Sequence, residues 1–179
     1  MDPRSLQVET PRLLLRPPRR DDFDAFVAFN GSAESMRHLG GPQPRSVAWR
    51  NFLTGVGAWY VQGFGMFSVF EKSTGRWIGR VGPNQPEGWP GTEIGWGIAR
   101  DYCGCGYATE AATATIDWAF ANLDWTEVIH VIDIGNAPSQ AVARKLGSRN
   151  RGPGQLPAPF VDSVIDIWGQ SKAEWLSRG

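Results

Sequence analysis

The residues whose types and spacing predict chemistry lie in one short stretch near the middle of the chain. Residues 103–111 read Cys-Gly-Cys-Gly-Tyr-Ala-Thr-Glu-Ala, between a strand-like run that ends at Ile98 and an alanine-rich helix predicted from about Tyr107. The first backbone N–H groups of a helix have no partner inside it and lie at the positive end of its dipole. A strand, a Gly-x-Gly turn and a helix start in succession therefore predict a phosphate-binding site.

Strands and helices on both sides must position this turn. Short apolar or alternating runs predict strands over residues 9–16, 64–72, 76–82, 92–98, 126–134 and 160–169. Apolar residues at helical spacing predict helices over 20–30, 47–62, 107–123 and 138–146, with a last helical turn at 172–177. Segments rich in Gly, Pro and Ser predict loops over 31–46, 83–90 and 151–159.

The order of these elements predicts how they pair. The three strands between residues 64 and 98 are expected to form an antiparallel meander, since tight turns join them. The strand at 92–98, the helix at 107–123 and the strand at 126–134 form a βαβ unit, in which the strands are parallel. Ligands of such units bind beyond the carboxyl ends of the strands. The sequence therefore predicts a mixed α/β sheet in a single domain over residues 1–179.

Composition excludes several classes of function. Eighteen basic and eighteen acidic residues give a formal net charge of zero, so no basic surface for nucleic acid or an anionic membrane is predicted. No run reaches the roughly 18 apolar residues of a membrane span, and residues 1–20 lack the apolar segment of a signal peptide, so we expect a cytoplasmic protein. Two cysteines are too few for a disulfide framework, and no metal site is predicted. A homodimer is one option for the oligomeric state.

Four segments, taken in order, resemble the GNAT superfamily of N-acetyltransferases. They are residues 9–16 (Glu-Thr-Pro-Arg-Leu-Leu-Leu-Arg), 93–96 (Glu-Ile-Gly-Trp), the turn at 103–108, and 136–147 (Asn-Ala-Pro-Ser-Gln-Ala-Val-Ala-Arg-Lys-Leu-Gly). Within the superfamily they are most similar to the branch of Rim-type ribosomal-protein N-terminal acetyltransferases. The resemblance covers nearly the whole chain, and it implies a mixed sheet whose two central parallel strands splay apart, with helices on its flanks.

The resemblance implies that acetyl-CoA is the co-substrate and that its acetyl group passes directly to a primary amine in a ternary complex. The acceptor would be a protein N-terminal amine or a small-molecule amine. Backbone N–H groups of the turn would hold the pyrophosphate, and the pantetheine arm would enter the gap between the splayed strands. The implied cofactor-binding residues are Trp96, Gly97, Ile98, Cys103, Gly104, Cys105, Gly106, Tyr107, Ala108, Asn136 and Ser139.

Two residues match catalytic positions of the family. Glu93 matches a carboxylate that takes the amine proton, although it is also interpretable as a strand-edge charge or a substrate anchor. Ser139 matches a polar residue beside the CoA sulfur and is a candidate proton donor to the leaving thiolate; otherwise it is an ordinary first-turn helix residue. Ala143 stands where many members have a tyrosine that acts as general acid, and Cys105 stands where a basic residue is common.

Other interpretations stay open. The altered turn and Ala143 also fit a non-catalytic acyl-CoA-binding module, and the glycine turn of a βαβ unit is shared with dinucleotide-binding oxidoreductases, although no acidic ribose ligand follows Ile134. His130, inside an apolar strand, is interpreted as a core residue. A thiol at a helix N-terminus has a lowered pKa, which makes Cys103 and Cys105 candidate reactive groups, although no His lies close in sequence and the resemblance implies no covalent intermediate.

Overall fold

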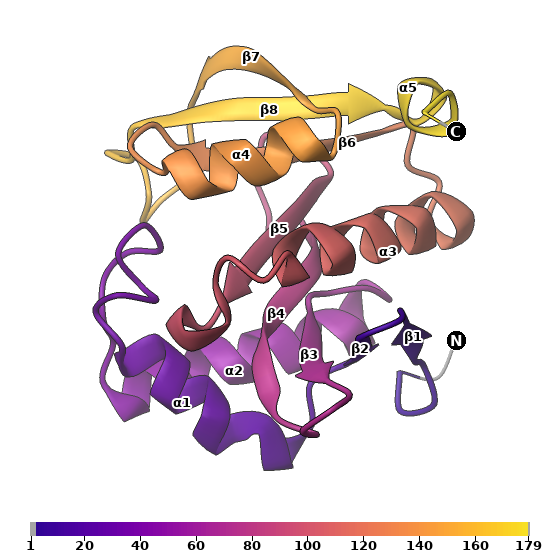
Figure 1. The fold of residues 1–179 in the computed structure, drawn as a ribbon. Helices are drawn as coiled ribbons and strands as arrows, with labels where there is room; N and C mark the ends of the chain where they lie inside the picture. Colours follow the sequence, from indigo (N-terminus) through magenta and orange to yellow (C-terminus); the bar gives the residue numbers. More distant parts are fainter. Residues whose placement is uncertain (1–2, 179) are drawn as a thin grey trace.

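The computed structural model describes residues 3–178 and contains an eight-stranded mixed sheet in the order β1-β2-β3-β4-β5-β6-β8-β7 (Figure 1). The strands are β1 (Val8–Glu9), β2 (Leu13–Arg16), β3 (Phe67–Glu71), β4 (Trp77–Asn84), β5 (Glu93–Ile98), β6 (Glu127–Asp133), β7 (Arg149–Gly154) and β8 (Ile165–Ser171). The helices are α1 (Phe23–Gly31), α2 (Arg45–Val61), α3 (Tyr107–Asn122), α4 (Ala137–Lys145) and α5 (Lys172–Leu176). Single 3₁₀ turns lie at Arg20–Asp22 and Arg100–Tyr102.

The predicted meander and βαβ unit are both confirmed. Strands β3, β4 and β5 pair antiparallel, and β6 follows α3 to lie parallel to β5. The β5–β6 pairing is confined to one register position, Glu93 opposite Ile129, whereas β6 pairs with β8 along its whole length. The sheet therefore opens between β5 and β6 at its centre.

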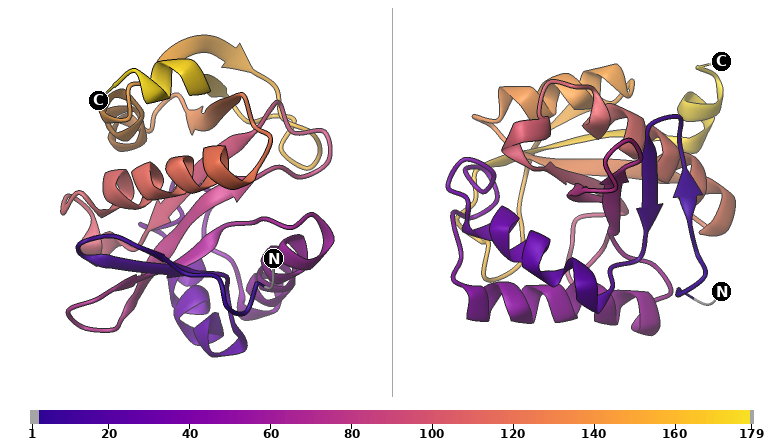
Figure 2. Two further views of the ribbon diagram at one scale, coloured as in Figure 1. Left: turned by 90° about the vertical axis from the view of Figure 1, so that its right-hand side faces the viewer. Right: turned by 60° about the horizontal axis from the view of Figure 1, so that its bottom comes forward.

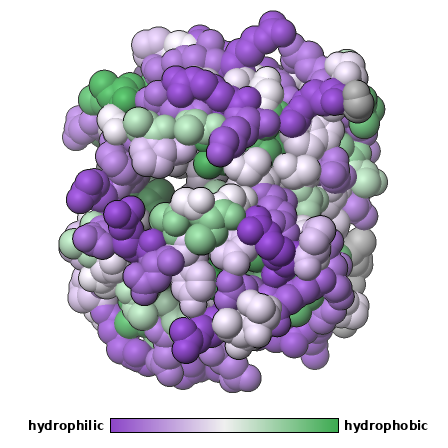
Figure 3. All heavy atoms as spheres, viewed as in Figure 1, coloured by the Kyte–Doolittle hydropathy of each residue, from purple (hydrophilic) through white to green (hydrophobic). Residues whose placement is uncertain are grey.

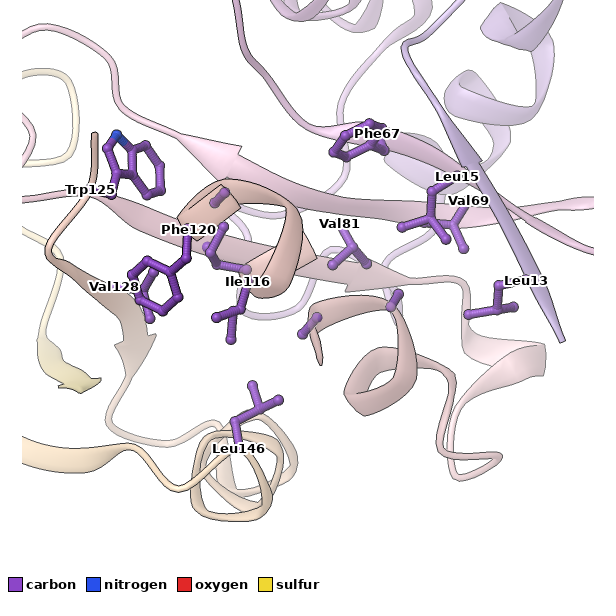
Figure 4. Packing of buried hydrophobic residues seen from close by; sticks show 14 of the residues in the cluster. Leu13, Leu15, Phe67, Val69, Val81, Ile116, Phe120, Trp125, Val128 and Leu146 are labelled. Carbon is purple, nitrogen blue, oxygen red and sulfur yellow. The ribbon is translucent and has the colours of Figure 1, made fainter. Parts of the chain in front are cut away.

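Helices cover both faces of the sheet. Figure 2 (left) shows α3 on one face of the central strands and the α1–α2 pair on the opposite face. Small residues of α3, among them Ala111, Ala112 and Ala119, are fully buried and let this helix approach the sheet closely. Figure 4 shows Ile116 and Phe120 of α3 among the apolar side chains of this core. A second cluster joins α1 to α2 through Phe23, Phe26 and Phe52.

Four expectations about strands were wrong in detail. Residues 9–16 form the two-stranded hairpin β1–β2 because the chain turns at Thr10, whose N–H donates to the Leu13 carbonyl. Strand β4 continues through Pro83, where no N–H is needed because the β3 pairing ends at Val81. Residues 149–154, mostly assigned to a loop, form the edge strand β7, and β8 begins at Ile165 instead of residue 160.

Within residues 3–178, no helix is long and apolar enough to cross a bilayer.

Candidate active site

The glycine turn presents unpartnered backbone N–H groups at the start of α3. Gly104 and Gly106 have φ of 81° and 82°, a left-handed conformation that side-chain-bearing residues rarely adopt. Gly106 is the N-cap of α3, and no side chain caps the helix. The N–H groups of residues 104–109 therefore make no hydrogen bond within residues 3–178, which leaves them available to an anion.

Arg12, from the hairpin before α1, braces this turn from outside. Its Nη1 donates to the Cys105 carbonyl at 3.0 Å, and its Nε donates to Glu110 Oε2 at 2.6 Å. The guanidinium also lies over the Tyr107 ring, 4.5 Å from its centroid. Sequence reasoning missed this contact, although residues 9–16 had been singled out. A cation therefore stands beside the turn even though position 105 is a cysteine.

On the side that faces β6, the backbone of β5 has no strand partner beyond Glu93 within residues 3–178. Ala99 N–H donates to the Ile78 carbonyl at 2.8 Å, so alternation along this antiparallel pair directs the polar groups of Gly97 toward β4. The polar backbone groups of Ile94, Trp96 and Ile98 consequently face the gap, and those of Trp96 have no partner within residues 3–178. Figure 3 shows the surface hollowed here, between α4 and the N-terminal end of α3.

Side chains satisfy the backbone at the point where β5 and β6 separate. Glu93 Oε1 accepts the N–H of Val131 at 3.1 Å, and His130 Nδ1 lies 2.7 Å from the Ile94 carbonyl oxygen. His130 Nε2 lies 3.0 Å from Ser148 Oγ, so both ring nitrogens have partners. The residue is 1% exposed, and burial lowers its pKa to about 4, which keeps the ring neutral at physiological pH. His130 is a core residue, as expected, but it also holds the gap open.

Glu93, the first residue of β5, carries a buried carboxylate. It is 6% exposed, and its Oε2 accepts from Asn84 Nδ2 at 2.7 Å and from Trp89 Nε1 at 2.8 Å. Burial raises the pKa of Glu93 above its usual value, against the opposing effect of these hydrogen bonds and of the Arg80 charge. A carboxylate with a raised pKa, fixed by three donors, has the properties of a general base.

Ser139 and Trp96 lie together on the α4 side of the gap. The Trp96 indole N–H donates to Ser139 Oγ at 3.1 Å, so the serine hydroxyl proton is free to point elsewhere. The Ser139 N–H donates to Asn136 Oδ1 at 3.1 Å, which makes Asn136 the side-chain cap of α4. Ala143, one helical turn further on, is fully buried against Ile132 and Trp168.

The two thiols lie on the outer side of the turn. Both are exposed and unpaired, and the Cys103 Sγ lies 3.6 Å from the Ile98 carbonyl oxygen. Partial burial raises the pKa of the Cys103 thiol, so the expectation of a lowered pKa at a helix start was wrong for this residue. Burial outweighs any effect of the helix dipole on the Cys103 pKa, because Cys103 precedes Gly106, the N-cap of α3.

Two tryptophans of α2 lie in different surroundings. Trp59 is 3% exposed and donates its indole N–H to the Met66 carbonyl, so it is a core residue. Trp49 packs edge-on against Phe23 and borders an open hollow of about 490 Å³ together with Arg20 and Arg45. None of the predicted site residues lines this hollow. His38 lies instead near the gap, with Nδ1 3.3 Å from Asp133 Oδ1 at the end of β6.

Comparison with known proteins gives the class to which this fold and site belong. Residues 12–149 match a family model described as an acetyltransferase (GNAT) domain, which spans more than half of the sequence. The chain therefore belongs to the GNAT acetyltransferase family, and the mixed sheet with splayed central strands is the fold of that family.

The chain is also similar to individual proteins and to solved structures. The chain is 38% identical over 87 residues to the Bacillus subtilis protein YkkB, about half of each chain (48% of this one and 51% of the relative). It is 27% identical over 154 residues to N-acetyltransferase YnaD of the same organism, with 82% and 85% coverage. An acetyltransferase structure from Agrobacterium tumefaciens is 29% identical, with a TM-score of 0.82 over 93% of this chain and 95% of that one.

Proposed function

We propose that this protein transfers the acetyl group of acetyl-CoA directly to a primary amine within a ternary complex. The observation that carries the proposal is a broken row of backbone groups without partners within residues 3–178, at Trp96 on the edge of β5 and at residues 104–109 in the glycine turn. Such a row suits a ligand with amides at one end and a diphosphate at the other. Acetyl-CoA has this construction, and the family to which the chain belongs supports its choice.

The residues present fit this co-substrate. Trp96 and Ile98 would bond the pantetheine amides and Gly97, between them, would stay in the ladder with β4. Backbone groups of Cys103, Gly104, Cys105, Gly106, Tyr107 and Ala108 would hold the pyrophosphate. An N–H directed into the gap near Ile98 would stabilise negative charge on the acetyl oxygen as it develops.

Glu93 and Ser139 would handle the two protons of the reaction. Glu93 takes one proton from the ammonium, and the neutral nitrogen bonds to the acetyl carbon. As the carbon–sulfur bond breaks, the nitrogen loses its second proton to solvent, which leaves the amide and the CoA thiolate. Ser139 donates to the departing thiolate, since its oxygen already accepts from Trp96 and its own proton is free. Because Ala143 supplies no acid, solvent finally protonates the sulfur.

The acceptor is proposed to be a protein N-terminal amine or a small amine, as in the Rim-type branch. Structures that share the fold at 16% identity include the ribosomal L7/L12 alpha-N-protein acetyltransferase RimL and the aminoglycoside acetyltransferase AAC(6')-Ib. Their different substrates leave both acceptor types in view, so the acceptor must be found by assay.

The test combines binding and turnover in one sample. Calorimetric titration with acetyl-CoA, CoA and NAD should show binding of the two CoA species only, and adding an amine should then release free thiol. Glu93→Gln should lower kcat while leaving acetyl-CoA affinity unchanged. Ser139→Ala should lower kcat with a smaller loss of acetyl-CoA affinity, whereas Glu87→Gln, at an exposed carboxylate, should change neither. Tight acetyl-CoA binding without thiol release for any amine would favour an acyl-CoA-binding module instead.

A further inference from the structure

Arg80 of β4 lies on the same face of the sheet as Glu93. Arg80 pairs with Gly97 of β5 and with Ser68 of β3, and directly opposed residues of antiparallel strands direct their side chains to one face. Because side chains alternate along a strand, Gly95 and Glu93 share the face of Gly97. This is the face covered by α1, since Phe29 lies where a Gly97 side chain would be.

The guanidinium of Arg80 has no anionic partner. Its Nε is buried and makes no hydrogen bond, and no ion pair involves Arg80 within residues 3–178. The guanidinium lies over the Phe26 ring, with Arg80 Cζ 5.8 Å from the ring centroid. The neighbouring Arg16, by contrast, is paired with Asp22 at 2.6 Å. A buried guanidinium nitrogen without a hydrogen-bond partner is costly, so the lack of an anion beside Arg80 calls for an explanation.

The charges of Arg80 and Glu93 interact, although the two side chains form no ion pair. Burial lowers the pKa of Arg80, and the negative charge of Glu93 opposes that change, yet the two groups are not within ion-pair distance. Arg80 is only partly buried. Because β3 and β5 flank its backbone on both sides, the exposed surface of Arg80 lies at the end of its side chain. A positive group and a proton-accepting carboxylate thus stand on one face, beside the strand that borders the gap.

We propose that Arg80 binds an anionic group of the acceptor, and that the acceptor is a small molecule carrying both a primary amine and a carboxylate or phosphate. Its amine would face Glu93, and its anionic oxygens would take the free donors of Arg80. A polycationic acceptor would be disfavoured by the same guanidinium. This inference rests on the proposed acetyl transfer and adds the class of acceptor.

The test uses acceptors matched in shape but not in charge. Thiol release is measured with a panel of amino acids, the corresponding amino acid amides, aminoalkyl phosphates and spermidine. Wild-type protein should favour the carboxylate or phosphate compounds over the amides by about 10- to 100-fold in kcat/KM. This is the rate difference expected from the free energy of one charge-assisted hydrogen bond. Which anionic series reacts faster identifies the group that Arg80 takes.

Variants locate the preference at Arg80. Arg80→Met should remove the preference mainly through KM, Arg80→Lys should keep part of it, and Arg76→Met, on the exposed turn before β4, should leave it unchanged. Unaltered acetyl-CoA affinity shows that each variant is folded. Equal rates for acids and amides in the wild type, or a preference that survives Arg80→Met, would overturn the inference.

A failure of the proposed function is distinguishable from a failure of this inference. If acetyl-CoA binds but no amine is acetylated, the transfer reaction is wrong, and the affinity of the CoA-bound protein for the same amino acids is measured by titration instead. Affinity for amino acids but not for their amides, lost in Arg80→Met, would support the anion site on its own. No difference between wild type and Arg80→Met in that titration would overturn it.

Discussion

Replacing Trp89 by phenylalanine tests whether Glu93 is the base. The change removes the indole N–H that donates to Glu93 Oε2 at 2.8 Å and keeps an aromatic ring in place. A hydrogen bond to a charged group contributes about 1.5–3 kcal/mol, and every 1.4 kcal/mol changes an equilibrium about tenfold. Because the bond stabilises the ionised carboxylate, its loss should raise the pKa of Glu93 further.

The assay is kcat/KM as a function of pH with the best available amine. The acid limb should move to higher pH in Trp89→Phe, so that the rate at a fixed pH on that limb falls about tenfold while the alkaline plateau is unchanged. Trp175→Phe is the matched control, because it removes an indole-to-carboxylate bond of 2.7 Å to Asp117, outside the candidate site. An acid limb that does not move in Trp89→Phe, or that moves equally in Trp175→Phe, would refute the assignment of Glu93 as base.

Three further predictions concern the turn and the gap. Gly106→Ala should weaken acetyl-CoA binding and lower stability by about 1–2 kcal/mol because of its φ of 82°, measured by titration and by urea unfolding. Arg12→Gln should weaken CoA binding, with a reduced salt dependence of the affinity, whereas Arg19→Gln should not. The pKa of His130 is depressed in the folded state, so it contributes stability above its ordinary pKa of 6.5. That contribution, about 3 kcal/mol, should be lost as pH falls toward about 4, and His130→Gln should flatten this part of the stability curve.

Local patterns in the sequence predicted the elements well. The glycine turn, the Asn136 cap and the apolar runs each depend on neighbouring residues, so their conformations follow from short-range chemistry. Strand β7 escaped prediction because it lies at the sheet edge, is largely exposed and contains Gly152 and Pro153, which mimic a loop. An edge strand with one partner needs no apolar alternation.

The contacts that complete the candidate site could not be read in this way. Arg12 and the Cys105 carbonyl are 93 residues apart, and Glu93 and the Val131 N–H are 38 apart. The residue types at these positions are compatible with many partners, and only the fold selects among them. The sequence did not single out Arg80, because an arginine in a predicted strand is common. Its lack of a carboxylate partner became visible only in the structure.

The gap between β5 and β6 begins where side chains replace the strand ladder, and one of these side chains is the proposed base, Glu93. A parallel pair normally continues its ladder, and separating two strands exposes N–H and C=O groups at a cost. Here Glu93 accepts the Val131 N–H and His130 engages the Ile94 carbonyl, so the first positions past the last pair are already satisfied. The bond from Val131 also fixes the carboxylate that would take the amine proton. Glu93→Gln would therefore leave at least one buried donor unpaired, so part of its cost should be structural, and the Trp89→Phe pH profile separates that part from proton transfer.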